Sequence, residues 1–194
     1  MIADVPRETR ERLALLQRLV LDESARQNLI AASSVPDFES RHIADSLQLL
    51  PHLPAGTIVD IGSGAGFPGL VIACCRNDPI HLVEPRARRA EFLARAAEAL
   101  GVSGHAQVHK STVERIALPP VSAITARAVA ALPALFAMAS HLSDSRTRWV
   151  LPKGRSASTE LDAARRSWQG DFRLIPSTTY PEAAILIAEA VTRR

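Results

Sequence analysis

Apolar residues recur with helical spacing in the first part of the chain, from Pro6 to about residue 32. Leu13, Leu16 and Val20 fall on one side of such a helix, and Arg, Glu and Gln residues occupy positions between them. This pattern is typical of an amphipathic helix that buries one stripe. Pro36 then interrupts the pattern, so the first helix should end before it.

A second, shorter helix is expected after this proline. It would carry Ile43 and Leu47 on its apolar side and end before Pro51. Asp37 or Ser40 could cap its first turn, because their side-chain oxygens can accept hydrogen bonds from free backbone N–H groups there.

From Thr57 onward, short β-branched runs alternate with longer helical stretches. Strands are expected at 57–61, 80–84, 106–109, 122–126 and 148–151, with two more near 172–175 and 184–189. Helices are expected at 67–76, 86–100, 130–141 and 156–167, and Gly101 could end the second of these with a left-handed cap. This alternation predicts an α/β fold with a mostly parallel, seven-stranded sheet covered on both faces. We therefore expect residues 1–54 to form a helical extension packed on a domain of residues 55–194.

Composition narrows the class of protein. A chain of 194 residues with 47% apolar residues can bury a sizeable core within one domain. The 23 Lys and Arg against 20 Asp and Glu give a net charge of only +3, so the whole molecule is not a strongly basic nucleic-acid binder, although a local basic patch is compatible with this balance.

The cysteines and the absence of long apolar runs indicate the compartment. Cys74 and Cys75 are adjacent in an apolar helical run, without the spaced His or Cys partners of a zinc site, which is typical of reduced thiols in a cytoplasmic protein. No run of about 18 apolar residues and no signal-peptide pattern is present in the sequence. We therefore expect neither a bound metal nor a membrane partner.

A glycine-rich segment follows the first expected strand. Residues 59–69 read V-D-I-G-S-G-A-G-F-P-G, with Gly62, Gly64 and Gly66 at alternate positions. Glycines there allow positive φ and close approach of the backbone to a nucleotide. Phe67 would lie at the mouth of this loop, where its ring could cover a purine. The glycines alone are a weak motif, because dehydrogenases, methyltransferases and ordinary turns share it.

Glu84 strengthens the nucleotide interpretation. It closes the next expected strand, about 20 residues past the glycine loop, where this architecture binds the hydroxyls of an adenosine ribose. The alternative is a solvated carboxylate stabilised by the start of a helix.

Three further groups lie where expected strands end, and therefore at the ligand-binding edge of the sheet. Residues 111–114 could offer backbone groups to an adenine. Arg127 lies between two alanines, which leaves room for its guanidinium to hold a carboxylate or phosphate, although a lone Arg often only extends along a sheet edge. Lys153 precedes a glycine and could equally be an ordinary turn residue.

His42 and Asp45 are three residues apart, so a helix would place them on one face. Such a pair is more often a structural hydrogen bond than a catalytic dyad, unless the helix packs over the glycine loop. The sequence contains no recognisable Ser-His-Asp set and no phosphate-loop lysine.

Six segments, in order over nearly the full chain, resemble the bacterial 16S ribosomal RNA guanine-N7 methyltransferases, formerly called glucose-inhibited division protein B. They are Asn28-Leu29, Arg41-His42-x-x-Asp45-Ser46, D-I-G-S-G-A-G-F-P-G from Asp60, Glu84-Pro85-x-x-x-Arg89-x-x-Phe92-Leu93, Ala126-Arg127-Ala128 and Lys153-Gly154. The resemblance implies a Rossmann-like, S-adenosylmethionine-dependent methyltransferase fold. It also implies methylation of a guanine in the 530 loop of 16S ribosomal RNA, within the small ribosomal subunit or its precursor.

The resemblance also implies site residues. Carried over by position, the cofactor contacts would be Gly62, Phe67, Val113, Glu114 and Arg127, with Glu84 on the ribose. Gly64 and Gly66 complete the expected cofactor loop, and Arg127 and Lys153 are the expected catalytic residues. One departure lies in the first helix, where Glu23 and Ser24 stand in place of a Trp-Asn pair.

Two other functions fit parts of the same pattern. An NAD-dependent oxidoreductase could use the same glycines and Glu84, but the Phe67-Pro68 closure argues against room for a second nucleotide half. A non-catalytic nucleotide-binding module associated with the ribosome would keep the pocket without turnover. We expect a monomeric methyltransferase.

Overall fold

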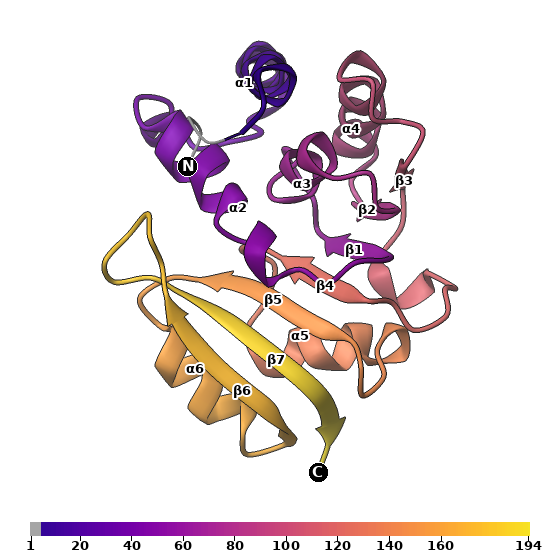
Figure 1. Ribbon diagram of the computed structural model, residues 1–194, viewed down its shortest axis with the longest axis vertical. Helices are drawn as coiled ribbons and strands as arrows, with labels where there is room; N and C mark the ends of the chain where they lie inside the picture. Colours follow the sequence, from indigo (N-terminus) through magenta and orange to yellow (C-terminus); the bar gives the residue numbers. More distant parts are fainter. Residues whose placement is uncertain (1–4) are drawn as a thin grey trace.

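The computed structural model describes residues 5–194 and contains one seven-stranded sheet in the order β3-β2-β1-β4-β5-β7-β6 (Figure 1). The strands are β1 (Ile58–Ile61), β2 (Ile80–Val83), β3 (Ala106–His109), β4 (Ala123–Ala126), β5 (Arg148–Lys153), β6 (Trp168–Pro176) and β7 (Ala184–Arg193). The first five strands pair in parallel, and β7 pairs antiparallel with both β5 and β6. The predicted α/β fold and its mostly parallel sheet are confirmed.

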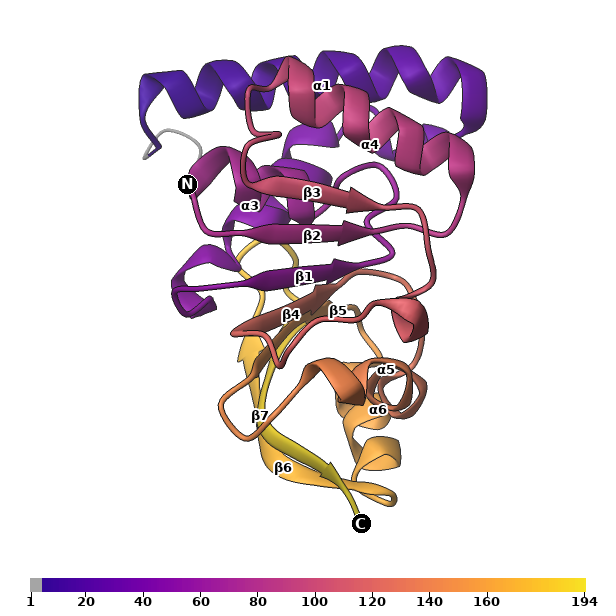
Figure 2. The ribbon, with the colours of Figure 1, turned by 90° about the vertical axis from the view of Figure 1, so that its right-hand side faces the viewer.

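Helices cover both faces of this sheet. They are α1 (Arg7–Gln27), α2 (Asp45–Leu47), α3 (Gly69–Cys75), α4 (Ala87–Ala99), α5 (Leu132–Ala139) and α6 (Ala157–Ala164). Figure 2 shows α1, α3 and α4 on one side of the strands and α5 and α6 on the other. Two apolar clusters match these sides, because Ile58 and Leu82 belong to the first and Val59 and Val83 to the second.

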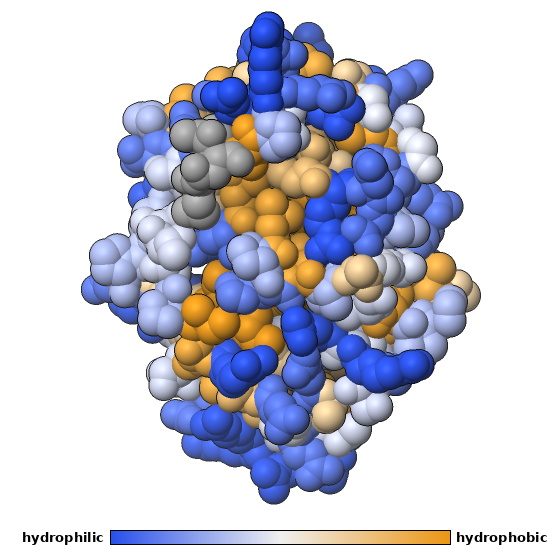
Figure 3. All heavy atoms as spheres, in the orientation of Figure 1, coloured by the Kyte–Doolittle hydropathy of each residue, from blue (hydrophilic) through white to orange (hydrophobic). Residues whose placement is uncertain are grey.

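The surface reflects this layering. Figure 3 shows apolar side chains gathered over the region between α2 and α3, with hydrophilic side chains covering the two ends of that face. None of the helices in residues 5–194 is long and apolar enough to cross a membrane. Both cysteines are free, Cys74 being buried and Cys75 half-buried.

The segment between α1 and β1 departs from the predicted second helix. It forms a π-helical turn (Glu39–Ala44), the short α2 and a 3-10 turn (Leu50–His52). The predicted caps are wrong: among residues 5–194 no side chain caps this turn, and the Ser40 hydroxyl instead donates to the Asp37 carbonyl. A π-helical turn is wider than an α-helical one and is common at functional sites.

The other differences concern boundaries. Strands β6 and β7 are longer than predicted, because their antiparallel pairing continues from Pro176 and Ala184 to the far ends of both strands.

The predicted left-handed cap after α4 is present, with Gly101 at φ +67° and the Val102 N–H bonded to the Ala97 carbonyl.

We predict that two Gly→Ala substitutions separate packing from backbone strain. At Gly69 an added methyl group would collide with Leu82 and with the Asp60 carboxylate, so the free energy of unfolding should fall by about 3 kcal/mol. At Gly101 no described atom lies within 4 Å of the added methyl group, so only the positive φ contributes, at about 1 kcal/mol. Urea unfolding of both variants measures the difference, and equal losses would contradict a tight contact between α3 and the sheet.

Candidate functional site

The glycine loop leaves β1 and enters α3 with the backbone predicted for it. Gly62, Gly64 and Gly66 have φ values of 65°, 55° and 94°, which favour glycine. The N–H groups of Gly62 and Ser63 both donate to the Val83 carbonyl, at 2.8 and 3.1 Å. The loop therefore folds back over the end of β2.

Asp60 anchors this loop from inside the sheet. Its side chain is fully buried: Oδ1 accepts a hydrogen bond from the Thr125 hydroxyl at 2.8 Å, and Oδ2 accepts one from the Gly69 N–H at 3.1 Å. Burial raises the pKa of Asp60 to about 6, although hydrogen bonds from Ser63, Thr125 and Gly69 oppose the shift. The carboxyl group thus connects β1, β4 and the start of α3.

Glu84 lies against the same loop. Only 4% of it is exposed; Oε2 accepts a hydrogen bond from the Gly64 N–H at 3.1 Å and Oε1 accepts one from the Arg86 N–H at 2.9 Å. The alternative of a solvated carboxylate at a helix start is therefore wrong. Two backbone donors fix the orientation of a buried group that has lone pairs left for a ligand.

A cavity of about 330 Å³ opens beside Glu84. Among the expected cofactor residues, Gly62, Glu84, Val113 and Glu114 line it. Gly64 contributes through its bond to Glu84, whereas the described lining includes neither Gly66, Phe67 nor Arg127. The structure thus brings the glycine loop, the end of β2 and the turn after β3 together around one space.

Phe67 does not lie open at the mouth of the loop. It is only 4% exposed, and its ring stacks on His42, with centroids 4.9 Å apart and an interplanar angle of 21°. Phe38 meets the same ring edge-on at 5.7 Å. The expectation that Phe67 covers a purine from the loop mouth does not fit this arrangement, because the segment before β1 already covers the ring.

Arg127, just after β4, binds that covering segment. One guanidinium nitrogen, Nη1, donates to the Arg41 carbonyl at 2.8 Å and to Asp45 Oδ2 at 3.3 Å. The other, Nη2, donates to His42 Nδ1 at 3.1 Å, and the guanidinium carbon lies 5.3 Å from the Phe67 ring centroid. The His42–Asp45 helix therefore does pack over the glycine loop.

His42 has a partner at both ring nitrogens. Nδ1 accepts from Arg127, so Nε2 carries the proton and donates to the Ser34 hydroxyl at 3.0 Å. Burial, followed by the charges of Arg127 and Arg41, lowers the pKa of His42 to about 4. The imidazole is neutral near pH 7 and serves as a hydrogen-bond acceptor in this cluster.

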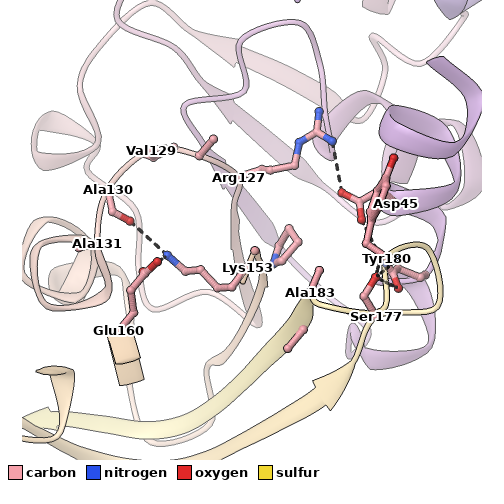
Figure 4. Close-up of a pocket in the computed structure, with 15 residues that line it drawn as sticks. Asp45, Arg127, Val129, Ala130, Ala131, Lys153, Glu160, Ser177, Tyr180 and Ala183 are labelled. Atoms are coloured by element: carbon pink, nitrogen blue, oxygen red, sulfur yellow. Dashed lines mark hydrogen bonds and ion pairs between the residues drawn. The ribbon is translucent and has the colours of Figure 1, made fainter. Parts of the chain in front are cut away.

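A second, larger cavity of about 570 Å³ lies beside Arg127 (Figure 4). Lys153 lines it, and its Nζ donates to the Ala130 carbonyl at 3.2 Å and to Glu160 Oε2 at 2.9 Å. Tyr180, from the β6–β7 connection, also lines this cavity, and the sequence offered no signal for that residue. The two expected catalytic residues thus share one cavity.

Ala128 and Val129 line both cavities and form the wall between them. Ala128 has φ +56°, an unusual value for a residue with a Cβ atom. Val129 faces Gly62, because a methyl group added at Gly62 would collide with the Val129 side chain. Two ligands bound in the two cavities would meet at this wall.

Basic side chains gather next to the smaller cavity. A groove of about 560 Å³ between the end of α1 and the start of α4 is lined by Arg26, Arg86, Arg88 and Arg89, among others. Within residues 5–194, Arg86, Arg88 and Arg89 have no acidic ion-pair partner. Arg26 and Arg95 both pair with Glu23, at 3.6 and 3.1 Å. The local basic patch that the moderate net charge allowed is therefore present. Residues 5–194 contain no group of three or more His, Cys, Asp or Glu side chains that could hold a metal ion.

The chain is similar to known proteins over nearly its whole length. The family model described as rRNA small subunit methyltransferase G matches residues 9–178. A ribosomal RNA small subunit methyltransferase G from Rhizorhabdus wittichii is 46% identical, with 98% of this chain and 89% of the relative covered. Its counterpart from Zymomonas mobilis is 42% identical, over 95% of this chain and 87% of the relative.

Solved structures share the fold at low sequence identity. A SAM-dependent methyltransferase from Aquifex aeolicus has a TM-score of 0.62 at 13% identity, covering 83% of this chain and 99% of that one. An O-methyltransferase from Bacillus cereus in complex with SAH has a TM-score of 0.59 at 16% identity, covering 90% of each chain. These likenesses confirm the Rossmann-like methyltransferase fold.

We predict that His42 makes stability depend on pH below neutrality. The pKa of His42 is about 4 in the folded protein, against 6.5 for a free side chain. The stabilisation that the neutral imidazole gives to the folded state is therefore complete above pH 6.5. As the pH falls from 6.5 to 4, His42 of the unfolded chain binds a proton before His42 of the folded protein does, so the free energy of unfolding should fall by about 3 kcal/mol. Asp60, whose folded pKa is raised, acts in the opposite direction between pH 6 and 4.

The measurement is the difference in urea unfolding free energy between the parent and His42→Gln from pH 7 to 4. Asp60 is present in both proteins, so its contribution cancels in this difference. The difference should shrink as the pH falls, and a difference independent of pH would contradict a buried neutral imidazole.

Proposed function

The chain belongs to the rRNA small subunit methyltransferase G family, and from this premise we propose that it methylates N7 of a guanine in the 530 loop of 16S ribosomal RNA, with S-adenosylmethionine as the methyl donor. The observation that carries the proposal is the pair of cavities that meet at Ala128 and Val129. One has the features of a nucleoside site, and the other holds Arg127 and Lys153. The family match removes the reason to favour an NAD-dependent oxidoreductase.

The residues around the smaller cavity fit an adenosyl cofactor. Glu84 is held by two backbone N–H groups, and its remaining lone pairs could accept hydrogen bonds from two ribose hydroxyls. Gly62 presents bare backbone, and Val113 and Met138 supply apolar contacts. When bound, the cofactor supplies a methyl group on a sulfonium centre. We propose Gly62, Glu84, Val113 and Glu114 as direct contacts, with Gly64, Gly66 and Phe67 shaping the loop.

The chemistry of guanine N7 suits this site. N7 has an in-plane lone pair at neutral pH, so methylation there removes no proton and requires no general base. His42, the buried imidazole nearest to Arg127, already has a partner at each nitrogen. The task of the protein is then orientation, which can contribute on the order of 7–11 kcal/mol at best.

Arg127 and Lys153 would bind the target nucleotide in the larger cavity. Both are cations that line it, and each is anchored by a carboxylate, Asp45 for Arg127 and Glu160 for Lys153. Such anchoring fixes a cation before the ligand arrives and reduces the cost of ordering on binding. Arg127 is proposed as a contact to the nucleotide or to the polar end of the cofactor.

The arginine groove between α1 and α4 would hold RNA phosphates. Arg26, Arg86 and Arg88 line it, and guanidinium groups are well suited to phosphate. The target guanine must be unstacked, because the deep major groove of A-form RNA hides N7. We further propose that residues 1–54 act as a helical extension of a methyltransferase domain of residues 55–194, and that the protein acts as a monomer in the cytoplasm.

We predict methyl transfer to small ribosomal subunits from a strain that lacks the modification. Tritiated S-adenosylmethionine should label one guanine of the 530 loop, and nuclease mapping should place the label at N7. Label on protein, on another RNA or on a small molecule would overturn the proposal. Arg127→Ala should abolish labelling, because it removes a cation from the larger cavity, with circular dichroism reporting whether the fold is kept.

We also predict that Glu84→Ala weakens binding of S-adenosylhomocysteine by about 1–3 kcal/mol, because buried charge-assisted hydrogen bonds to the ribose would be lost. Calorimetric titration measures this, and NAD should give no binding heat. The matched control is Glu98→Ala, which removes an exposed carboxylate of α4. Unchanged affinity combined with lower stability in Glu84→Ala would mean that Glu84 only supports the glycine loop.

A further inference from the structure

The Tyr180 hydroxyl oxygen is buried without a hydrogen-bond partner, and Tyr180 lines the larger cavity. Among residues 5–194, three buried side-chain polar atoms lack a partner: Ser24 Oγ, Trp149 Nε1 and the Tyr180 hydroxyl oxygen. Of these three residues, only Tyr180 lines that cavity. A buried polar group left unsatisfied destabilises the free protein and calls for a physical reason.

The connection that carries Tyr180 is fixed in place. Ser177 donates its N–H to the Ala183 carbonyl at 2.9 Å, and Gln48 bonds the Ser177 hydroxyl and the Thr178 N–H. Asp45 accepts a hydrogen bond from the Thr179 hydroxyl through Oδ1 while its Oδ2 holds Arg127. One carboxylate therefore sets the relative position of Arg127 and the Tyr180 connection. Figure 4 shows the bond between Asp45 and Arg127.

The chemistry around Tyr180 suits a nucleobase. Among the described residues that line the cavity, Tyr180 is the sole aromatic, and the guanidinium carbon of Arg41 lies 5.8 Å from its ring centroid. Aromatic rings recognise unstacked bases by stacking, and hydrogen bonds to the base edge give selectivity. A phenol hydroxyl can both donate and accept, so it can pair with the O6 acceptor or with the N1 and N2 donors of guanine.

We propose that Tyr180 is a substrate-binding residue that contacts the target guanine in the larger cavity and hydrogen-bonds its edge through the hydroxyl. This inference rests on the proposed function, since it names the residue that would hold the methyl-accepting base. Arg127 and Lys153 supply charge, and Tyr180 supplies a neutral hydroxyl that bonds the edge of the base.

The test compares Tyr180→Phe, which removes only the hydroxyl, with Ser24→Ala, which removes another buried hydroxyl without a partner at a residue that lines neither of the two cavities nor the arginine groove. Methyl transfer to unmodified small subunits is measured as kcat and KM, and thermal melting is measured on the free proteins. Tyr180→Phe should raise KM, with kcat/KM about 10-fold lower and kcat nearly unchanged, because the bond would be present in both the bound and the transition state.

Both variants should melt at or above the temperature of the parent, because each loses an unsatisfied buried polar group. Ser24→Ala should keep the kinetics of the parent. Kinetics like the parent in Tyr180→Phe, or a loss in kcat alone, would overturn the assignment and leave the proposed function standing. Failure of the parent itself to label small subunits would overturn the proposed function, and this inference with it.

Discussion

The buried carboxyl group of Asp60 is the interaction on which the geometry of the ligand-binding edge depends. It joins the Thr125 hydroxyl on β4 to the Gly69 N–H at the start of α3, and these three segments approach closely only because Gly69 has no side chain. The hydrogen bonds offset part of the cost of burial, which still raises the pKa of Asp60 to about 6. With β1, β4 and α3 fixed, both ends of the glycine loop are held in place, and within the loop the Gly64 N–H bonds Glu84.

The segment before β1 depends in turn on Arg127. Its guanidinium bonds a backbone carbonyl, a carboxylate and an imidazole, all from residues 41–45. The imidazole can accept this bond only in the neutral form, and burial beside Arg127 and Arg41 keeps the pKa of His42 near 4. The wide π-helical turn and the first residue of α2 together place all three acceptors toward Arg127, and a regular α-helix, which is narrower, would space them differently. The segment before β1 thus completes the larger cavity, because Asp45 and Gln48 line it.

The sequence predicted those features that local chemistry decides. β-branched runs predicted the strand positions, and alternating glycines predicted the positive φ values. The order of the elements predicted that the glycine loop and Glu84 both follow strand ends, whereas the hydrogen bond between Gly64 and Glu84 was not predicted. Features that depend on distant partners were not predictable. Phe67 is buried because residues 38 and 42 cover it, and Tyr180 reaches the site through a connection held by Gln48. Neither contact leaves a local pattern, and the length of β6 and β7 likewise arises from their mutual pairing.

The wall between the cavities shows what a reaction without proton transfer requires of a protein. No acid or base has to be brought to the reacting atoms, so rate depends on holding two ligands in line and in direct contact where the two cavities meet, beside Ala128 and Val129. Ala128 keeps a backbone conformation that costs energy in most residues with a side chain, which is tolerable because β4 and Arg127 hold the residues before it. Gly62 leaves space where Val129 already sits. A larger residue at Ala128 or at Gly62 would shift the wall between the cavities. A displacement of about 1 Å at such a site can lower the rate on the order of 100-fold. The hydrogen bonds of Asp60, Asp45 and Arg127 hold the residues around the two cavities in place, and in the proposed mechanism this rigidity would keep the two ligands in line.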